Sequence, residues 1–421
     1  MTSDQLTRPA GAAAPSAVPA GAGGAAVRLP FVVYVLAVGT FLMLTTEFVV
    51  AGLLPEIAGD LQVSVAQAGL LITVFAVGMI VGSPTMALLT RRMPQRVTLM
   101  LALAVFAAGH VVVALGSSFP LLLGARFVTA WATGAFWSVA SVVATRAAGP
   151  AASARALGLV GAGGMLANVL GVPLGAFAGQ LAGWRGPFWA LAVLAMAAVA
   201  LIARHVPHDD ADQPGVSLRS ELAALRSGRL WLVLAACATT TGGVLSVYSY
   251  ISPLLTDRAG IAAGLVPLVL VGFGVGSLIG TIYGGRLGDV RPHATTIGVA
   301  AATTVVLTAI CLLSANAVFT VVLVAVLGLI GLSANPVLSA LAVRFAGVAP
   351  TLGVSMSVAA YNLGTAVGSW IAGLSLGSAL GATGPAVVGT VLAALTLVPA
   401  VAIALAQRRR ATRAAAVAVA A

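Results

Sequence analysis

One acidic residue lies inside a long apolar stretch of the chain. Nine of the ten acidic residues fall in tails, in loops or at the ends of apolar runs, and only Glu47 lies well within a run, at 31–54. An ionisable side chain in a membrane-spanning segment is rare and usually marks an ion or substrate path. Glu47 is therefore the candidate proton-carrying residue. The alternative is a neutral glutamic acid that hydrogen-bonds a neighbouring helix.

One arginine occupies a comparable position in another run. Arg126 lies six residues after Pro120, and Glu47 lies eight residues before Pro55. At 1.5 Å per residue, both are expected roughly 9–12 Å from the same end of their helices. Opposite charges at one depth can pair, which lowers the cost of burying either, and a proton on Glu47 would break the pair. Alternatively, Arg126 binds main-chain carbonyl groups and does not meet Glu47.

The elements that must position these residues are membrane-spanning helices. The 421 residues are 60% hydrophobic and 7% charged, whereas a soluble domain carries about 25% charged residues. The apolar runs lack the alternation of β-barrel strands, so the fold class predicted is an all-α integral membrane protein. Cys237 and Cys311 lie in apolar runs and indicate neither a disulfide framework nor a thiol metal site.

Twelve runs have the length of about 20 residues that a helix needs to cross the bilayer. They lie near 31–54, 66–89, 97–116, 120–145, 156–179, 185–204, 230–255, 263–285, 294–314, 317–343, 351–377 and 385–406. All 21 basic residues are arginines. With the N-terminus inside, only Arg185 and Arg258 fall in outer loops, and this bias predicts that both termini are cytoplasmic.

The chain is predicted to form two six-helix bundles. The linker between them predicts a short amphipathic helix on the membrane surface, beginning after Ser217, and the first segment is too rich in Ala, Gly and Pro to fold. The predicted parts are a disordered cytoplasmic tail at 1–29, bundles at 30–204 and 230–406, the linker at 205–229, and a cytoplasmic tail at 407–421.

The two bundles repeat each other. Phe75–Gly82 matches Phe273–Gly280 at an offset of 198 positions, and Gly171–Gly175 matches Gly364–Gly368 at an offset of 193. An even number of spans in each repeat implies a parallel repeat about an axis normal to the membrane.

Glycines recur every four residues on two of these runs. Small residues at that spacing let helices approach closely in lipid. We expect them to form a smooth interface on which the halves rock, although static packing is the alternative. The glycines concerned, with one proline among them, are Gly163, Gly171, Pro173, Gly175, Gly179, Gly272, Gly276, Gly280 and Gly284.

Beyond residue 30, nearly the whole chain resembles the major facilitator superfamily, specifically its twelve-span drug:proton antiporters. Gly163 followed by Gly171–Gly175 (GVPLG) is similar to the antiporter motif, and Leu122–Phe127 (LLGARF) to the intramembrane arginine motif. Thr46–Phe48 (TEF) and Ala135–Trp137 (AFW) resemble the bacterial chloramphenicol exporters and their sugar- and purine-efflux relatives.

The loop motif of that family is degraded in the first half. After the second span the family carries G-x-L-x-D-R-x-G-R-[KR], and here Arg91 stands in place of the Asp, followed by Arg92 and Arg96. The second copy keeps the acid as Asp289, near Arg291. The resemblance therefore implies a gating role for Asp289, with an ordinary solvated charge as the alternative.

In the resembled fold, spans 1, 4, 7 and 10 line a central cavity. Third spans face away from it, so His110 is expected to be structural. Aromatic walls with few polar anchors suit small amphiphilic or uncharged ligands, although each aromatic residue could instead be a core or interface residue. The candidate contacts are Tyr34, Trp131, Phe136, Trp137, Tyr248, Tyr250, Asn335, Tyr361 and Asn362.

The resemblance implies a secondary active transporter in a bacterial inner (plasma) membrane. It would export a small organic compound, chloramphenicol-like antibiotics first among the substrates, in exchange for protons. It would act as a monomer, with no cofactor beyond the proton gradient and no nucleic-acid partner. A sugar or nucleobase exporter and a non-transporting membrane sensor are the alternatives. The membrane interior offers no second carboxylate and no His/Cys cluster for an enzyme, and a chain without Lys cannot hold the G-x-x-x-x-G-K-[ST] loop of an ATP-driven pump.

Overall fold

The computed structural model describes residues 29–89, 93–149, 152–207, 225–347 and 350–420, and within these ranges every regular element is a helix. The predicted N-terminal tail up to residue 28 and the amphipathic helix predicted after Ser217 lie outside the described residues, as do Arg91 and Arg92.

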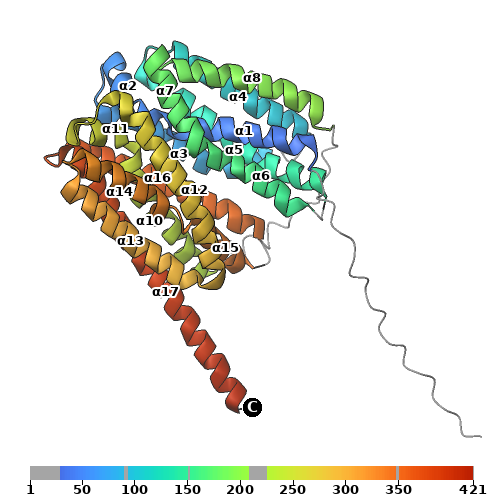
Figure 1. Ribbon diagram of the computed structural model, residues 1–421. Helices are drawn as coiled ribbons and strands as arrows, with labels where there is room; N and C mark the ends of the chain where they lie inside the picture. The colour runs from blue at the N-terminus through green and yellow to red at the C-terminus, as the bar shows by residue number, and fades with distance from the viewer. Residues whose placement is uncertain (1–28, 90–92, 150–151, 208–224, 348–349, 421) are drawn as a thin grey trace, which may run out of the picture.

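The N-terminal half crosses the molecule six times (Figure 1). Its third crossing is α4 and its fourth is α5, and the fifth is made of α6, η3 and α7 end to end. The elements are α1 (Phe31–Val49), η1 (Val50–Gly52), α2 (Leu54–Leu61), α3 (Val65–Leu89), α4 (Gln95–Leu115), α5 (Phe119–Ala148), α6 (Ser153–Leu166), η3 (Ala167–Gly171), α7 (Val172–Ala182) and α8 (Gly186–His205).

The C-terminal half lies beside it with the same plan (Figure 1). Here α14 and α15 together make one crossing, and α17 runs on past the predicted end of the last span. The elements are α10 (Gly228–Ser249), α11 (Ile251–Pro253), η4 (Leu254–Arg258), η5 (Ala263–Leu265), α12 (Val266–Val290), α13 (Pro292–Leu313), α14 (Ala317–Gly331), α15 (Asn335–Ala346), α16 (Pro350–Leu376), η6 (Gly381–Thr383) and α17 (Gly384–Ala420).

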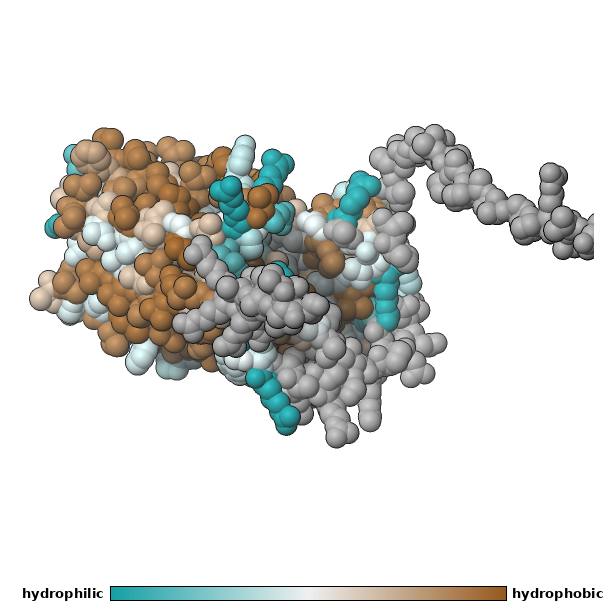
Figure 2. Space-filling view, turned by 90° about the horizontal axis from the view of Figure 1, so that it is seen from below, coloured by the Kyte–Doolittle hydropathy of each residue, from teal (hydrophilic) through white to brown (hydrophobic). Residues whose placement is uncertain are grey.

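Eleven helical segments of the described residues are long and apolar enough to cross a membrane. The predicted span at 351–377 coincides with α16, which is 27 residues long but is not among the eleven. Polar residues, including Ser357, Tyr361, Asn362 and Thr365, lower the mean hydropathy of this continuous helix. In Figure 2, the part of the face away from the residues drawn in grey is largely hydrophobic, as the surface of a protein surrounded by lipid must be.

The second and eighth predicted spans occupy equivalent places. A side chain at Gly78 of α3 would meet the carbonyl oxygen of Phe127 on α5. Counting 198 positions on from each residue gives Gly276 of α12 and Ala325 of α14, and the same contact recurs between them. The predicted repeat is therefore present in the packing, partner by partner.

The fifth and eleventh spans behave in the same way. Gly171 lies against Thr45 of α1, and 193 positions later Gly364 of α16 lies against Ala238 of α10. Close approach is required at both places, because a side chain at either glycine would overlap its neighbour.

These contacts bear on one prediction. The glycines of the fifth span, among them Gly163 and Gly175, pack against α1 of their own half. Gly280 and Gly284 pack against main-chain atoms of Leu329 and Ser333, also in their own half. In this structure these glycines hold each bundle together, while α12 meets η3 of the other half at Gly274. The expectation that they form the interface on which the halves rock stays a prediction.

The two halves meet toward one end of the molecule. We name the end at which α1 begins the termini end, and the end that carries α2 and η6 the far end. Toward the far end, Tyr250 of the C-terminal half donates to the carbonyl of Ala66 at 3.5 Å, and Gln180 donates to the carbonyl of Ala263 at 2.6 Å. Nearer the middle, Ser369 of α16 shares a hydrogen bond of 2.8 Å with α3.

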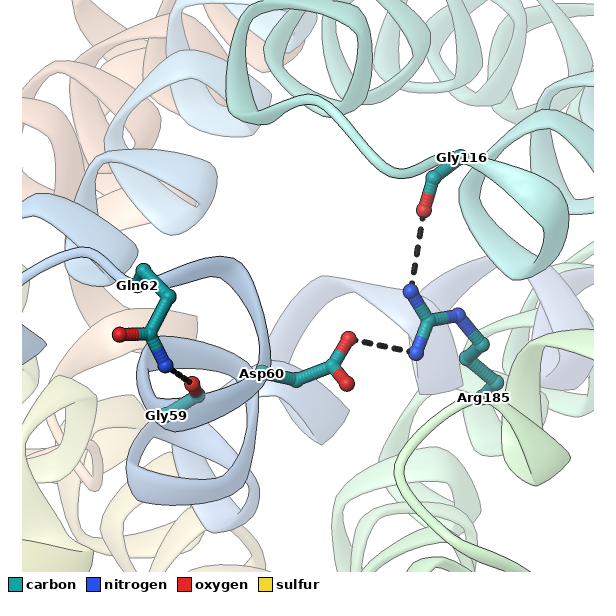
Figure 3. A network of polar contacts seen from close by, with 5 residues as sticks. All are labelled: Gly59, Asp60, Gln62, Gly116 and Arg185. Atoms are coloured by element: carbon teal, nitrogen blue, oxygen red, sulfur yellow. Dashed lines mark hydrogen bonds and ion pairs between the residues drawn. The ribbon is translucent and has the colours of Figure 1, made fainter.

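An ion pair anchors the far end of the first span (Figure 3). Arg185, which precedes α8, bonds Asp60 of α2 at 2.6 Å and the carbonyl of Gly116 at 3.1 Å, and its guanidinium lies over the Trp184 ring at 4.2 Å. These contacts fasten α2, and with it the end of α1, to the other crossings of the N-terminal half.

Candidate functional site

A cavity of about 170 Å³ lies between the two halves. It is on the termini side of the contact between α3 and α16, because its α16 residues precede Ser369 in a helix that begins at the termini end. Its lining residues are Glu47, Phe48, Asn168, Thr241, Leu245, Tyr248, Phe273, Leu332, Asn335, Tyr361, Asn362 and Thr365.

Glu47 is the one acidic residue in this wall. It is half-buried in the last turn of α1, and its carboxyl group makes no hydrogen bond or ion pair with the described residues. A carboxyl group held in a membrane cavity without a partner is available to a proton or a ligand.

Arg126 of α5 does not pair with Glu47. Its side chain is buried and donates from Nη1 to the carbonyl and the hydroxyl of Thr46, each at 2.9 Å. Nη2 donates to the main-chain oxygen of Glu47 and Nε to that of Leu71, each at 3.3 Å, and the guanidinium lies over the Phe75 ring at 4.2 Å. Arg126 therefore binds mainly main-chain carbonyl groups, which was the alternative to an ion pair with Glu47.

The end of α1 explains what Arg126 binds. The α-helical pattern stops at Val49 and tightens into η1, and the last carbonyl groups of an α-helix lack partners within the helix. A cation beside those carbonyls also meets the negative end of the helix dipole. Arg126 therefore caps α1 from a neighbouring helix, and one of the oxygens that it binds is the main-chain oxygen of Glu47.

The wall supplied by the C-terminal half is polar but uncharged. Tyr248 Oη, Thr241 Oγ1, Asn335 Oδ1 and Asn362 Oδ1 are buried there without a hydrogen-bond partner. Buried polar atoms are normally bonded, so four orphans around one cavity call for an explanation. Their simplest common partner is a molecule that enters the cavity.

Aromatic rings from both halves form another part of the cavity wall. The Tyr248 ring stacks on Phe273 of α12 with 4.4 Å between centroids, and Phe48 of α1 meets Tyr248 edge-on at 5.7 Å. Tyr361 is held differently, since its hydroxyl donates to the carbonyl of Asn335 at 2.7 Å. The cavity therefore combines a flat apolar surface with free hydrogen-bonding atoms.

A π-helical turn brings Asn168 into this wall. Pro173 has no N–H to donate to the carbonyl four residues earlier, and its ring crowds that turn. The chain accommodates this with η3, and such π turns are frequent at functional sites. The GVPLG sequence thus reshapes the backbone as well as providing small residues.

Comparison with known proteins identifies the family. A sequence model described as Major Facilitator Superfamily matches residues 36–349. The chain belongs to the Major Facilitator Superfamily. Members of this superfamily are membrane transporters, so the protein is a multi-pass membrane transporter and not an enzyme.

Individual relatives agree with this assignment. The chain is 37% identical over 376 residues to a chloramphenicol resistance protein of Streptomyces lividans, covering 88% of this chain and 96% of the relative. It is 33% identical to the inner membrane transport protein YdhP of Escherichia coli (strain K12), covering 88% and 95%.

A solved structure shares the fold. A bacterial homolog of the human lysosomal transporter Spinster, in an inward-facing and occupied conformation, matches with a TM-score of 0.70 at 16% identity, covering 90% of this chain and 96% of the other. At that identity the likeness concerns the fold alone.

Of the nine candidate cavity residues of this transporter, four line the cavity: Tyr248, Asn335, Tyr361 and Asn362. Five lie elsewhere. Tyr34 is exposed and Phe136 is buried against α1 at Gly39, while Trp131 and Trp137 are half-buried on α5. Tyr250 joins the halves toward the far end.

The remaining loop candidates lie at the termini end of the transporter. Arg96 donates to the carbonyl of Ala203 on α8. Asp289 and Arg291 are exposed at and after the last turn of α12, and Asp289 makes no ion pair with the described residues. In this conformation Asp289 is a solvated charge, which was the alternative to a gating role.

Sequence reasoning missed several residues of the site. Phe48, Asn168, Thr241 and Phe273 line the cavity, and Asn168 carried a signal in the Pro173 that follows it by five positions. Phe48, Thr241 and Phe273 lie on predicted spans with apolar residues on all sides. Such a pattern does not show which side of the helix faces the cavity. His110, expected to be structural, bonds Thr46 beside Arg126.

Proposed function

We propose that this transporter exports small, uncharged organic compounds, chloramphenicol-like antibiotics first among them, in exchange for protons. One observation carries the proposal: a single cavity joins an unpaired carboxyl group from one half to unpartnered neutral polar atoms from the other. The similarity to a chloramphenicol resistance protein supports this choice of substrate.

The chemistry of the free atoms defines the ligand. Asn335 Oδ1 and Asn362 Oδ1 can only accept hydrogen bonds, so the ligand supplies O–H or N–H groups. The stacked rings of Tyr248 and Phe273 favour a flat aromatic group. A phenicol offers a substituted benzene ring, two hydroxyl groups and an amide N–H. A sugar offers the donors without the ring.

Glu47 would carry the proton. When the cavity opens outward, substrate leaves and the carboxyl group takes a proton from outside. The neutral side chain then returns with the cavity to the inside, where substrate binding displaces the proton. The proton gradient supplies the free energy, and no cofactor is needed. Arg126, fixed on the end of α1, provides a constant positive charge beside the carboxyl group.

The transporter would lie in a bacterial plasma membrane as a monomer, with its termini end in the cytoplasm. The arginine distribution supports this orientation. Asp289 would act in gating only in another conformation of the cycle.

Chloramphenicol accumulation in an efflux-deficient bacterial host tests the proposal. Expression should lower accumulation, and a protonophore should abolish the difference. Unchanged accumulation, with the protein confirmed in the membrane, would exclude phenicols, and a panel of sugars and nucleobases would follow. Lowered accumulation that resists the protonophore would contradict proton coupling. Binding without flux would indicate a sensor.

A further inference from the structure

His110 is a buried titratable residue outside the cavity wall. It lies on α4, 1% exposed, between the rings of Phe106 and Phe188. Its Nδ1 is 2.7 Å from the carbonyl oxygen of Phe106, and its Nε2 is 2.7 Å from the hydroxyl of Thr46. That hydroxyl also accepts a hydrogen bond from Nη1 of Arg126.

Hydrogen-bond chemistry fixes the protons in this chain. The carbonyl of Phe106 can only accept, so Nδ1 carries the hydrogen. In a neutral ring Nε2 is then an acceptor, and the hydroxyl of Thr46 donates to it. The same hydroxyl turns its lone pairs toward Arg126. Neutral His110 therefore orients Thr46 to receive the guanidinium, and each group in the chain has a partner.

A proton on His110 would upset this arrangement. Nε2 would become a donor, so the Thr46 oxygen would face two donors and its own hydrogen would lose its acceptor. Two cations would also flank one hydroxyl group in a buried site, where charges interact strongly.

We propose that His110 is a positioning residue that holds Arg126 on the end of α1 through Thr46. The ring acts in its neutral form, because a proton at Nε2 would weaken that hold, and it keeps the guanidinium on main-chain oxygens beside the carboxyl group of Glu47. The inference rests on the proposed proton exchange, and it adds a residue that acts through Arg126 and does not touch the substrate.

Among the described residues packed around His110, one acidic side chain lies near Arg126. Of the elements packed around His110, α1 presents Glu47 and α5 presents Arg126. The crossing α8 presents Phe188, and the ion pair of Arg185 with Asp60 lies beyond its first residue. That acidic side chain is Glu47. Arg126 already binds the main-chain oxygen of this residue.

Two matched pairs of variants test this role. His110→Gln keeps an acceptor for Thr46 without a titrating ring, whereas His110→Leu removes the acceptor. Thr46→Ser keeps the hydroxyl group, and Thr46→Val removes it at nearly constant volume. Chloramphenicol export into inverted membrane vesicles would be measured from pH 5 to 8.

We expect His110→Leu and Thr46→Val to lower export by about two- to tenfold, the value of one buried hydrogen bond. The double variant should be no worse than either single one, because both break the same chain. Thr46→Ser should match the parent. His110→Gln should match the parent as well, because its amide oxygen keeps an acceptor for Thr46. Losses in His110→Gln as large as those in His110→Leu, or additive losses in the double variant, would overturn the proposal.

A measurement without transport separates this inference from the proposed function. The thermal unfolding midpoint of the purified proteins would be followed across the same pH range in detergent. Acid should lower the parental midpoint more than that of His110→Gln, because a proton on His110 removes the acceptor of Thr46. Equal acid shifts would overturn the role of His110 even if export is proton-coupled. Unequal shifts in a protein that exports no tested compound would leave His110 in place and remove the proposed substrate.

Discussion

The two halves of this transporter share a scaffold and differ in chemistry. The residue equivalent to Glu47, counted 193 positions on, is Thr240, and the residue 198 positions after Arg126 is Val324. Thr240 is uncharged and Val324 is a buried core residue. The interior carboxyl and guanidinium groups described above therefore belong to the N-terminal half, while the C-terminal half contributes the unpartnered neutral atoms of the cavity.

The difference shows which parts of the repeat are free to change. Glycine contacts with neighbouring main-chain atoms recur at the same offsets, because any side chain there would separate the helices. Cavity positions carry no such constraint. One half can thus specialise in protons and the other in substrate while the backbone plan stays common to both.

Substitution of a glycine at such a contact should have the largest effect, and the same effect in either half. A side chain at Gly280 would overlap the carbonyl of Leu329, and one at Gly82 would meet the main chain of Trp131. We expect Gly280→Leu and Gly82→Leu to remove most folded protein from the membrane, measured by fluorescence-detected size exclusion. Gly272→Leu is the control, since the nearest atom to a side chain there is 3.8 Å away. Normal protein levels with lost transport would instead support the hypothesis that these glycines form the interface on which the two halves rock.

Glu47→Gln should abolish exchange and leave the protein folded. The amide keeps the size of the side chain but cannot release a proton, and the carboxyl group has no partner to lose. Protonophore-sensitive export should fall by at least about 100-fold, because loss of a proton-transferring group typically has an effect of that size. Thr240→Val, at the equivalent place, serves as the control. Full coupled export by Glu47→Gln would end the proton assignment.

Tyr248→Phe should weaken substrate binding selectively. The hydroxyl group has no partner in the protein, so its loss costs no internal hydrogen bond while the ring still stacks on Phe273. We expect phenicol affinity to fall by about two- to tenfold, with an unchanged unfolding midpoint. Tyr361→Phe is the matched variant, and because its hydroxyl donates to Asn335, stability should fall as well. Unchanged affinity in Tyr248→Phe would remove that hydroxyl from the substrate site.

Asp60→Asn should have the smallest effect. The pair with Arg185 is partly exposed, at 32% for the arginine and 43% for the aspartate side chain, and such pairs contribute about 1 kcal/mol or less. We expect a small drop in the unfolding midpoint and near-normal export. The remaining bond from Arg185 to Gly116 limits the loss. A large loss of export would show that the far end of α1 must stay fastened during the cycle.

Most of the fold could be predicted from the sequence because length and apolarity determine a membrane helix. The repeat was visible for a related reason, since the glycines at 78 and 276 are required by the packing. The crossing made by α16 was predicted from its length, although its polar residues, including Tyr361 and Asn362, lower its apolarity.

The site was less accessible to sequence reasoning. Depth along the helices placed Glu47 and Arg126 at one level, and they do lie close together. It could not show that α1 stops its α-helical pattern at Val49, which exposes carbonyl groups that bind the guanidinium. It also gave no rotation about the helix axis, so Tyr34 was expected in the cavity and His110 was not expected at Thr46.

The cap that Arg126 places on α1 bears on how such a transporter can evolve. The guanidinium is stabilised by main-chain oxygens, which no substitution removes, so its burial does not depend on the acid beside it alone. A lineage could therefore lose or relocate the acidic residue without losing the folded bundle. The first product of that loss would be a passive carrier for the same compounds, from which exchange could later be regained at another position.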